Sequence, residues 1–242
     1  MKCIIKKINF LNNIKKKLNN LNERNEWVKK QIESLPKGSS ILDAGCGSQR
    51  YKYLCEELNY FSQDFGKYKK DEKKTIGIDS RGLKNFENYS YGDLDYVGDI
   101  WDIKENNEKF DAILCTEVLE HIPYPIETIK EFSRLLKKGG ILILTAPSNC
   151  LRHMDPFFFS SGFSDRWYEK FLPLNKFEIE ELVQVGDYYR WIATEIGRTA
   201  MTHSLVSKIL LFPAFIYFFY KKKNKFSINT LAEGYHIRAK KL

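Results

Sequence analysis

A short glycine-rich turn carries the first residues in this chain whose types could bind a ligand. It reads Asp43-Ala44-Gly45-Cys46-Gly47 and directly follows the apolar run Ile41-Leu42. Glycines permit a tight turn and allow the backbone to approach a ligand closely. A dinucleotide-binding turn would carry a third glycine at position 50, but that residue is Arg50, so pyrophosphate binding is disfavoured. The Asp43 carboxylate inside the turn instead favours a ligand with a positive charge.

A second acidic residue is expected further along, because an acid about 20 positions after such a turn commonly holds ribose hydroxyls. Asp64 ends the apolar stretch 58–64 and lies 19 residues after Gly45. Asp79 ends a similar stretch, but it lies 34 residues after Gly45. The spacing favours Asp64 as the ribose ligand and leaves Asp79 as the alternative.

These residues can form one site only if the fold brings them to the same edge of a sheet. From Ser40 onward short apolar runs alternate with helical segments, a pattern typical of a parallel sheet with helices between its strands. Two runs at even spacing near the end of the chain predict further strands. Strands are predicted at 41–44, 58–64, 96–99, 110–115, 141–144, 177–185 and 235–239. The fold class predicted from this order is α/β.

Helices are predicted from apolar residues that recur every three or four positions. The predicted helices cover residues 4–34, 126–136 and 166–172. Gly139 and Gly140 are expected to end the second of them. We expect a basic helical segment at 1–36 and a single domain at 37–242, in which 205–225 is an apolar and basic insertion.

The composition narrows the class of protein. The chain has 242 residues, 43% of them hydrophobic, which is enough for one sizeable core. Its net charge of +8 is spread along the chain and rarely interleaved with aromatic residues, so nucleic-acid binding is disfavoured. There is no run of 18 apolar residues, no signal peptide, and no cysteine or histidine at metal-binding spacing. We therefore expect a cytoplasmic protein that has reduced thiols and no metal site, with a divalent metal that assists a hydroxyl acceptor as the open alternative.

The segment after the fifth predicted strand is where acceptor-binding groups are expected, because ligands lie at the carboxyl ends of parallel strands. It contains His153 and Asp155. We predict that His153 is a general base and that Asp155 orients it or contacts the acceptor. The alternative is that His153 only caps a loop.

An apolar segment near the C-terminus has two interpretations. Residues 209–220 are apolar or aromatic, with Lys208 before them and Lys221 to Lys223 after them. Basic flanks of this kind are typical of segments that lie on an anionic membrane, here its inner face. The alternative is a helix that packs on the sheet or in a homodimer contact.

The ordered set of motifs resembles the class I S-adenosylmethionine-dependent methyltransferases over roughly residues 38–195. Within that family the chain is similar to the group encoded with enzymes of cell-surface polysaccharide and glycan biosynthesis. The motifs are LDAGCGSQRY, NYFSQDF, YVGDIWDI, FDAILCTEVLEHIPYP and LLKKGGILILTAPS. The resemblance implies a Rossmann-like fold, with a mostly parallel central sheet, an antiparallel C-terminal strand and helices on both faces.

The resemblance also implies roles in binding S-adenosylmethionine. Its methionine end would lie against the turn that contains Asp43, Gly45, Cys46 and Gly47, and near Glu117. Asp64 would hold the ribose, and Asp99 and Ile100 would flank the adenine. One departure is Gln49, which stands where many members carry a third glycine. For Glu120 and His121 the resemblance favours a structural role beside the cofactor over a catalytic one.

We therefore predict a methyltransferase that acts on a hydroxyl or other group of a glycan precursor or small molecule. A scaffolding protein with a degenerate cofactor fold and an NAD-dependent enzyme are the alternatives. Methylation of a nucleic-acid base is disfavoured, because Cys115-Thr116-Glu117-Val118 stands where many base methyltransferases have Asn-Pro-Pro-Tyr.

Overall fold

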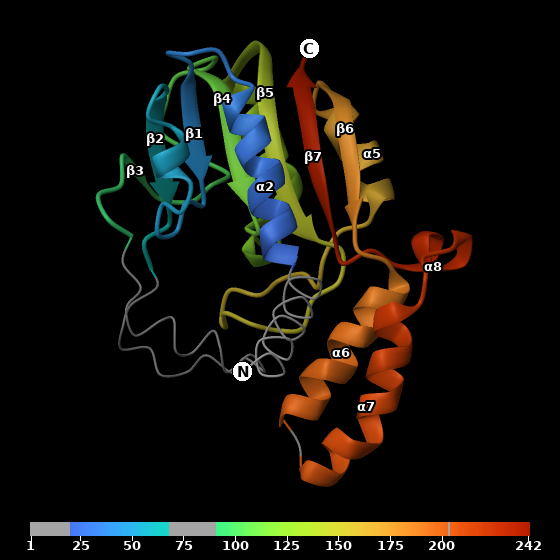
Figure 1. The fold of residues 1–242 in the computed structure, drawn as a ribbon. Helices are drawn as coiled ribbons and strands as arrows, with labels where there is room; N and C mark the ends of the chain where they lie inside the picture. Colours follow the sequence, from blue (N-terminus) through green and yellow to red (C-terminus); the bar gives the residue numbers. More distant parts are fainter. Residues whose placement is uncertain (1–19, 68–90, 203) are drawn as a thin grey trace, which may run out of the picture. The chain divides into compact units, whose positions relative to one another are not determined.

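The computed structural model describes residues 20–67, 91–202 and 204–242 (Figure 1). The chain forms two compact units. The sheet unit contains residues 27–183 and 235–242, and the helical unit contains residues 184–234 together with the described residues 20–26. Asp79 and residues 4–19 of the first predicted helix lie outside the described residues.

A seven-stranded sheet runs through the described residues, in the order β3-β2-β1-β4-β5-β7-β6. The pairs β1–β2, β1–β4, β2–β3 and β4–β5 are parallel, and β7 runs in the opposite direction (Figure 1). The strands are β1 (Ser40–Ala44), β2 (Asn59–Asp64), β3 (Tyr96–Val97), β4 (Phe110–Thr116), β5 (Leu136–Pro147), β6 (Phe177–Val185) and β7 (Gly234–Lys241). The predicted Rossmann-like α/β fold is confirmed.

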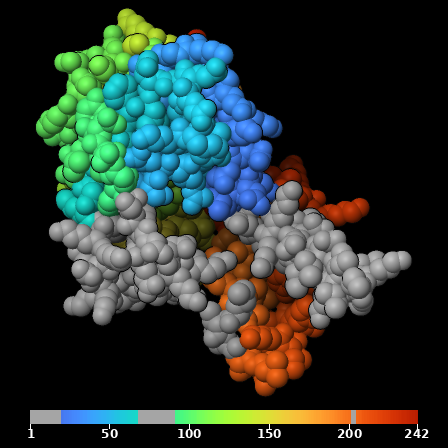
Figure 2. Space-filling view, turned by 60° about the vertical axis from the view of Figure 1, so that its left-hand side comes forward, coloured from blue at the N-terminus to red at the C-terminus, as the bar shows by residue number. Residues whose placement is uncertain are grey.

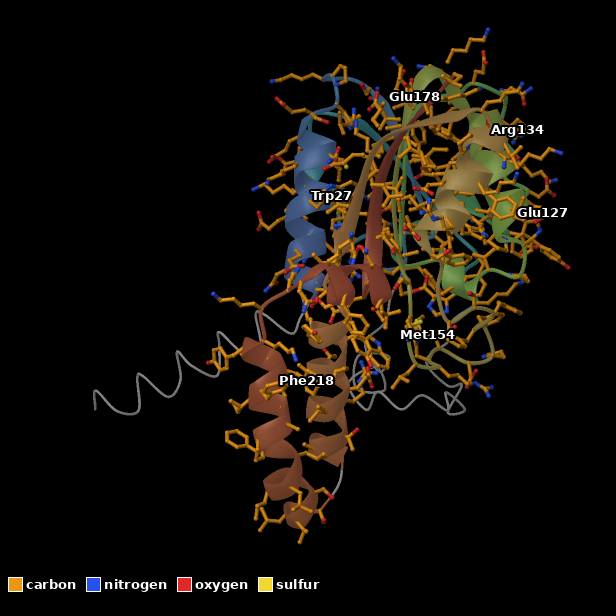
Figure 3. All side chains as sticks on the ribbon, turned by 90° about the vertical axis from the view of Figure 1, so that its right-hand side faces the viewer. Trp27, Glu127, Arg134, Met154, Glu178 and Phe218 are labelled. Carbon is orange, nitrogen blue, oxygen red and sulfur yellow. The ribbon has the colours of Figure 1, made fainter. Side chains whose placement is uncertain are left out.

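Helices cover both faces of this sheet. Figures 1 and 3 show α2 (Asn20–Glu33) on one face and α5 (Asp165–Leu174) on the other, and Trp27 of α2 lies against the strands. The ring of Trp27 lies 5.1 Å from that of His236 in β7. The other helices among the described residues of this unit are α4 (Pro125–Leu135) and the single 3-10 turns η1 (Lys52–Leu54) and η2 (Leu119–His121).

The core lies where β1, β4 and β5 meet α2. Ile41, Leu114 and Ile143 are fully buried there, and Val28 and Ile32 of α2 pack against them. Strands buried on both faces of a parallel sheet are apolar along their length, which explains the continuous apolar runs in the sequence. In the space-filling view the segments from α2 to β4, coloured blue to green, form one continuous packed surface (Figure 2).

The prediction that Gly139 and Gly140 end a helix is wrong. The helix α4 ends at Leu135, and both glycines lie inside β5, where its register with β4 shifts. A Cβ atom on Gly140 would lie 2.9 Å from the Lys137 carbonyl oxygen and 3.1 Å from that of Asp111. The glycines are therefore needed for an irregular strand rather than for a helix C-terminus.

The helical unit is built around a pair of helices, α6 (Tyr188–Thr202) and α7 (Leu205–Tyr220), followed by α8 (Lys225–Thr230). The predicted insertion at 205–225 corresponds to α7, whereas α6 was not predicted. Asp187 caps α6, because its Oδ1 accepts a hydrogen bond from the Arg190 backbone N–H at 3.1 Å. Among the residues that the structure describes, no helix is both long and apolar enough to span a bilayer.

An ion-pair centre holds this unit together. Arg190 contacts Glu23 at 2.8 Å and Glu233 at 2.9 Å. Gly186 comes close to the same centre, because a Cβ atom there would lie 2.8 Å from the Glu233 side chain. Burial raises the pKa of Glu233 to about 7, although the adjacent Arg190 opposes that shift.

Candidate functional site

The glycine turn and the end of β2 meet at the carboxyl edge of the sheet. The Gly47 backbone N–H donates a hydrogen bond to Asp64 Oδ2 at 2.9 Å. The Gly45 N–H donates to the backbone oxygen of Gln63 at 2.9 Å. The structure thus brings together two parts of the predicted site that lie 19 residues apart in the sequence.

Asp43 is the most deeply buried acid of the turn, with an exposed fraction of 2%. Its Oδ2 accepts a hydrogen bond from the Tyr60 hydroxyl at 2.8 Å. Burial raises the pKa of Asp43 to about 7, and the Tyr60 hydrogen bond only partly opposes this shift. A cationic ligand beside this carboxyl group would favour its ionised form and would itself be stabilised.

Gly45 cannot be replaced without a clash. Its φ is +73°, and a Cβ atom would lie 2.6 Å from a methyl carbon of Val118. The next residue, Cys46, is buried, and burial raises the pKa of its thiol, so the group stays protonated. Gly45 therefore provides the close approach between the turn and the segment after β4, and Cys46 packs beneath it.

Gln49 takes a conformation that glycine adopts more readily. Its φ is +56°, in the left-handed region. Its side-chain amide donates hydrogen bonds to the backbone oxygens of Tyr91, at 2.9 Å, and Asp93, at 2.6 Å. These contacts offset the cost of a non-glycine residue at this position.

Asp64 keeps hydrogen-bonding capacity for a ligand. Besides Gly47, the Gly66 N–H donates to its Oδ1 at 3.2 Å. Burial raises the pKa of Asp64, while these backbone donors act in the opposite direction. Each carboxylate oxygen has two lone pairs, so both oxygens can accept a further hydrogen bond.

Gln63 links two loops of the site, and no pattern in the sequence indicated this role. Its Oε1 accepts a hydrogen bond from the Gly45 N–H at 3.2 Å, and its Nε2 donates to the Gly98 oxygen at 2.7 Å. Tyr60 was missed for the same reason. Their register opposite Ala44 and Ile41 is set by strand pairing, which a single sequence does not show.

The loop after β3 contains Asp99 and Ile100, which differ in solvent exposure. Asp99 is exposed, and Ile100 is buried. The loop continues to Ile103, whose N–H donates to Glu131 at 2.9 Å and whose oxygen accepts from Arg134 at 2.9 Å. The ion pair between buried Glu131 and half-buried Arg134 therefore fixes this loop from α4.

Glu117 follows β4 directly and has a φ of +54°. Its N–H donates to the Thr145 backbone oxygen at 2.9 Å, and its Oε1 accepts from the Thr145 hydroxyl at 3.1 Å. A strained conformation in a non-glycine residue persists only where surrounding contacts enforce it, and such residues concentrate at functional sites.

One prediction was that Asp155 orients the His153 ring, and the structure, which describes both residues, shows no hydrogen bond between these two side chains. The Asp155 Oδ1 pairs with Arg152 Nε at 2.8 Å, while His153 Nδ1 is hydrogen bonded to the Leu151 oxygen at 2.8 Å. The imidazole of His153 is thus oriented by a backbone carbonyl rather than by Asp155. Figure 3 shows Met154, which lies between them in the chain, on the loop after β5.

His121 lies beside His153, and the two ring centroids are 4.7 Å apart. Its Nδ1 is hydrogen bonded to the Phe157 oxygen at 2.6 Å. Burial and the neighbouring His153 lower the pKa of His121 to about 4, so its ring is neutral at pH 7. The segments after β4 and β5 therefore meet through two histidines.

Comparison with known proteins agrees with this arrangement. A family profile described as "Methyltransferase domain" matches residues 16–189. A ubiquinone biosynthesis O-methyltransferase of Haemophilus ducreyi is 30% identical over 86 residues, which are 36% of this chain and 35% of that protein. A tRNA U34 carboxymethyltransferase of Nautilia profundicola is 31% identical over 110 residues, which are 43% of this chain and 33% of that protein.

The chain thus spans about a third of the length of these curated relatives. A solved structure of geranyl diphosphate methyltransferase in complex with SAM superposes with a TM-score of 0.53 at 14% identity. The alignment covers 90% of this chain and 84% of that one, and at this identity it shows the shared fold. Because the profile covers most of the chain, the protein belongs to the methyltransferase domain family.

Proposed function

We propose that this protein is an S-adenosylmethionine-dependent methyltransferase that acts on a hydroxyl group. The observation that carries this proposal is the buried Asp43 carboxyl group beside a turn that must contain glycine, with Asp64 hydrogen bonded to the same turn. Such a site offers negative charge to a cationic ligand and acceptor oxygens to ribose hydroxyls.

Bound S-adenosylmethionine would supply an electrophilic methyl group on a positively charged sulfur. Asp43 and the turn would hold its methionine end, and Asp64 would accept hydrogen bonds from its ribose. Asp99 and Ile100 would lie at the adenine, and Glu117 would lie near the methionine part. The protein's main contribution to such a displacement is alignment and exclusion of water.

The acceptor needs a base if its nucleophile is a hydroxyl group. His153 is our candidate, because its Nδ1 is engaged by the Leu151 carbonyl and its Nε2 is left to receive a proton. Asp155 is the candidate for contact with the acceptor. It is 9% exposed, and its Oδ2 has no hydrogen-bond partner among the described residues.

The class of acceptor is proposed as a small molecule or a glycan precursor. The relative from Haemophilus ducreyi is named as an O-methyltransferase, which agrees with a hydroxyl acceptor. The two curated relatives are named for ubiquinone biosynthesis and tRNA modification, so the link to polysaccharide synthesis stays a prediction from the sequence.

Isothermal titration with S-adenosylmethionine, S-adenosylhomocysteine and NAD tests the cofactor. We expect binding of both sulfur ligands at a single site and none of NAD. An Asp43→Asn protein should bind S-adenosylmethionine more weakly. Absence of binding by the wild-type protein to either sulfur ligand would overturn the proposal.

We also propose that α7 binds an anionic membrane surface. No residue of this 16-residue helix is buried, and several of its large apolar side chains are exposed, with Leu210 at 72% and Phe212 at 58%. Figure 3 shows side chains projecting from α7 along its length, with Phe218 labelled. Exposed apolar patches of this kind mark interaction surfaces.

The charges around α7 favour an anionic surface as the partner. Lys208 lies within the helix, and Lys222, Lys223 and Lys225 follow it in exposed positions. Lys221 lies 4.6 Å from the centres of the Tyr189 and Tyr217 rings. An apolar helix with basic residues at its end fits a surface with an apolar interior and anionic headgroups.

Co-sedimentation with phosphatidylglycerol vesicles tests this second proposal. We expect wild-type protein to sediment and a Leu205→Ser/Leu210→Ser/Phe212→Ser protein to stay in solution. Substitution of two exposed apolar residues of the sheet unit, Tyr53→Ser and Leu174→Ser, is the control and should change nothing. Equal sedimentation of all three proteins, or self-association of the wild type without vesicle binding, would overturn the proposal.

A further inference from the structure

We infer that Glu120, His121 and His153 form a binding site for a divalent transition-metal ion. One ligand atom from each side chain lies within 4.8 Å of the other two. Glu120 and His121 belong to η2, after β4, and His153 follows β5. Because β4 and β5 are paired in parallel as far as Thr116 and Thr145, their carboxyl ends bring these segments together.

The hydrogen bonds of the two histidines define which ring nitrogen is available. In each ring Nδ1 lies within hydrogen-bond distance of a backbone carbonyl, that of Phe157 for His121 and that of Leu151 for His153. A carbonyl oxygen can only accept, so the proton must be on Nδ1 and the lone pair of a neutral ring is on Nε2. Metal-binding histidines are commonly held in this way by an acceptor behind the ring.

The carboxylate completes the ligand set. Glu120 is 2% exposed, and its Oε1 lies 3.7 Å from His121 Nε2. A cation between these atoms would stabilise the buried carboxylate.

The ligand types indicate which ions fit. Two imidazoles and one carboxylate suit zinc, iron(II), cobalt(II) or manganese, whereas magnesium and calcium prefer oxygen ligands alone. With bonds of about 2.0–2.1 Å, two ligand atoms of one ion lie at most about 4.2 Å apart, so any pair near the 4.8 Å limit must draw together when the ion binds. Three protein ligands leave open positions, and an acceptor hydroxyl oxygen could occupy one of them, where the ion would favour loss of the hydroxyl proton. This last role rests on the proposed methyltransferase function, whereas the metal site does not. With the ion bound, His153 would act as a ligand in place of a general base, because its Nε2 cannot hold both the ion and a proton.

Titration of the metal-free full-length protein with cobalt(II), followed by visible absorption, tests the site. We expect one equivalent to bind and to produce bands typical of imidazole coordination. Glu120→Gln and His153→Asn should each weaken binding by at least roughly tenfold, the effect expected from the loss of a single ligand. His236→Asn is the matched control, because His236 lies against Trp27 and away from the cluster, and it should bind cobalt like the wild type.

Circular dichroism and S-adenosylmethionine titration of the same variants separate the outcomes. A variant that keeps its fold and binds S-adenosylmethionine but not cobalt supports the site. No cobalt binding by the wild type, or equal binding by all variants, overturns it. The cofactor proposal would stand in that case, provided that S-adenosylmethionine still binds.

Discussion

The sheet unit and the helical unit each contain a buried carboxyl group whose pKa is raised to about 7, but with different partners. Glu233 of the helical unit already has an internal cation, Arg190, at 2.9 Å. Asp43 of the sheet unit accepts a hydrogen bond from the neutral Tyr60 hydroxyl. The charge of Glu233 is thus paired within the protein, where it contributes to stability. Among the described residues the charge of Asp43 has no such internal cation, so it is available to a ligand.

The two units also differ in how far their apolar side chains are buried. The apolar side chains of β1 and β4 are fully buried, whereas several large apolar side chains of α7, such as Leu210 and Phe212, are more than half exposed. The match to the methyltransferase family ends at residue 189, two residues into α6. Chemistry common to the family is therefore expected in the sheet unit, which contains most of the matched residues.

The largest effect is expected from Gly45→Ala. The substitution combines a strained φ with a contact of 2.6 Å to Val118, at a cost of about 2–5 kcal/mol in free energy of unfolding. Binding of S-adenosylmethionine should be lost. Urea denaturation and titration measure the two effects.

Gly38→Ala is the matched control, because Gly38 has a φ of +78° and an added Cβ atom would meet nothing within 4 Å. It should cost only about 1 kcal/mol, the strain of the left-handed conformation alone. Adding Val118→Ala to Gly45→Ala should restore part of the stability. Equal costs at both glycines would show that the close approach in the turn is unimportant.

Arg190→Met should lower the free energy of unfolding by about 3 kcal/mol, because it leaves Glu233 buried without its cation. Amide hydrogen exchange should show the loss of protection within residues 184–234. Arg166→Met, which breaks an exposed pair with Glu169, is the control and should cost less than about 1 kcal/mol. Loss of protection spread evenly over both units would contradict the division into two units.

Asp43→Asn should weaken S-adenosylmethionine binding by about 10- to 100-fold, the range expected for losing a charged partner. Wild-type affinity should rise with pH up to about 7 and then level off, because Asp43 must ionise to pair with a cation. The variant should show no such step. Asp111→Asn, at the start of β4, should leave the affinity unchanged.

The pKa of Asp43 also affects the stability of the unliganded protein. Its folded-state pKa lies above the ordinary value of 3.8, so the folded protein holds the proton more tightly than the unfolded chain. Its stabilising contribution is present in full below pH 4 and is lost as the pH rises through 7. A thermal midpoint that rises over this interval in wild type relative to Asp43→Asn would contradict the assignment.

The smallest effect on stability is expected from Leu210→Ser in α7. Because this side chain is 72% exposed, its removal should change the free energy of unfolding by less than about 0.5 kcal/mol. Leu114→Ser in β4 should cost several times more, since Leu114 is fully buried. A large cost at Leu210 would mean that α7 is covered in solution, and denaturation with and without vesicles would detect this.

The sequence determined the elements whose signal is local. Apolar runs predicted β1, β2, β4 and β5, and the order of strands and helices predicted the α/β fold. The glycine turn was recognised because a positive φ and close approach restrict a position to one residue type. The same local signal misled at Gly139 and Gly140, since a glycine pair serves an irregular strand as well as a helix end.

The tertiary structure decided everything that depends on distant segments meeting. It placed Tyr60 on Asp43 and Gln63 between two loops through strand register, and it brought His121 and His153 together through the pairing of β4 with β5. It also left part of α7 exposed, although its apolar residues alone would suit a core. These outcomes follow from long-range pairing and burial, whose energies depend on neighbours that the local sequence does not specify.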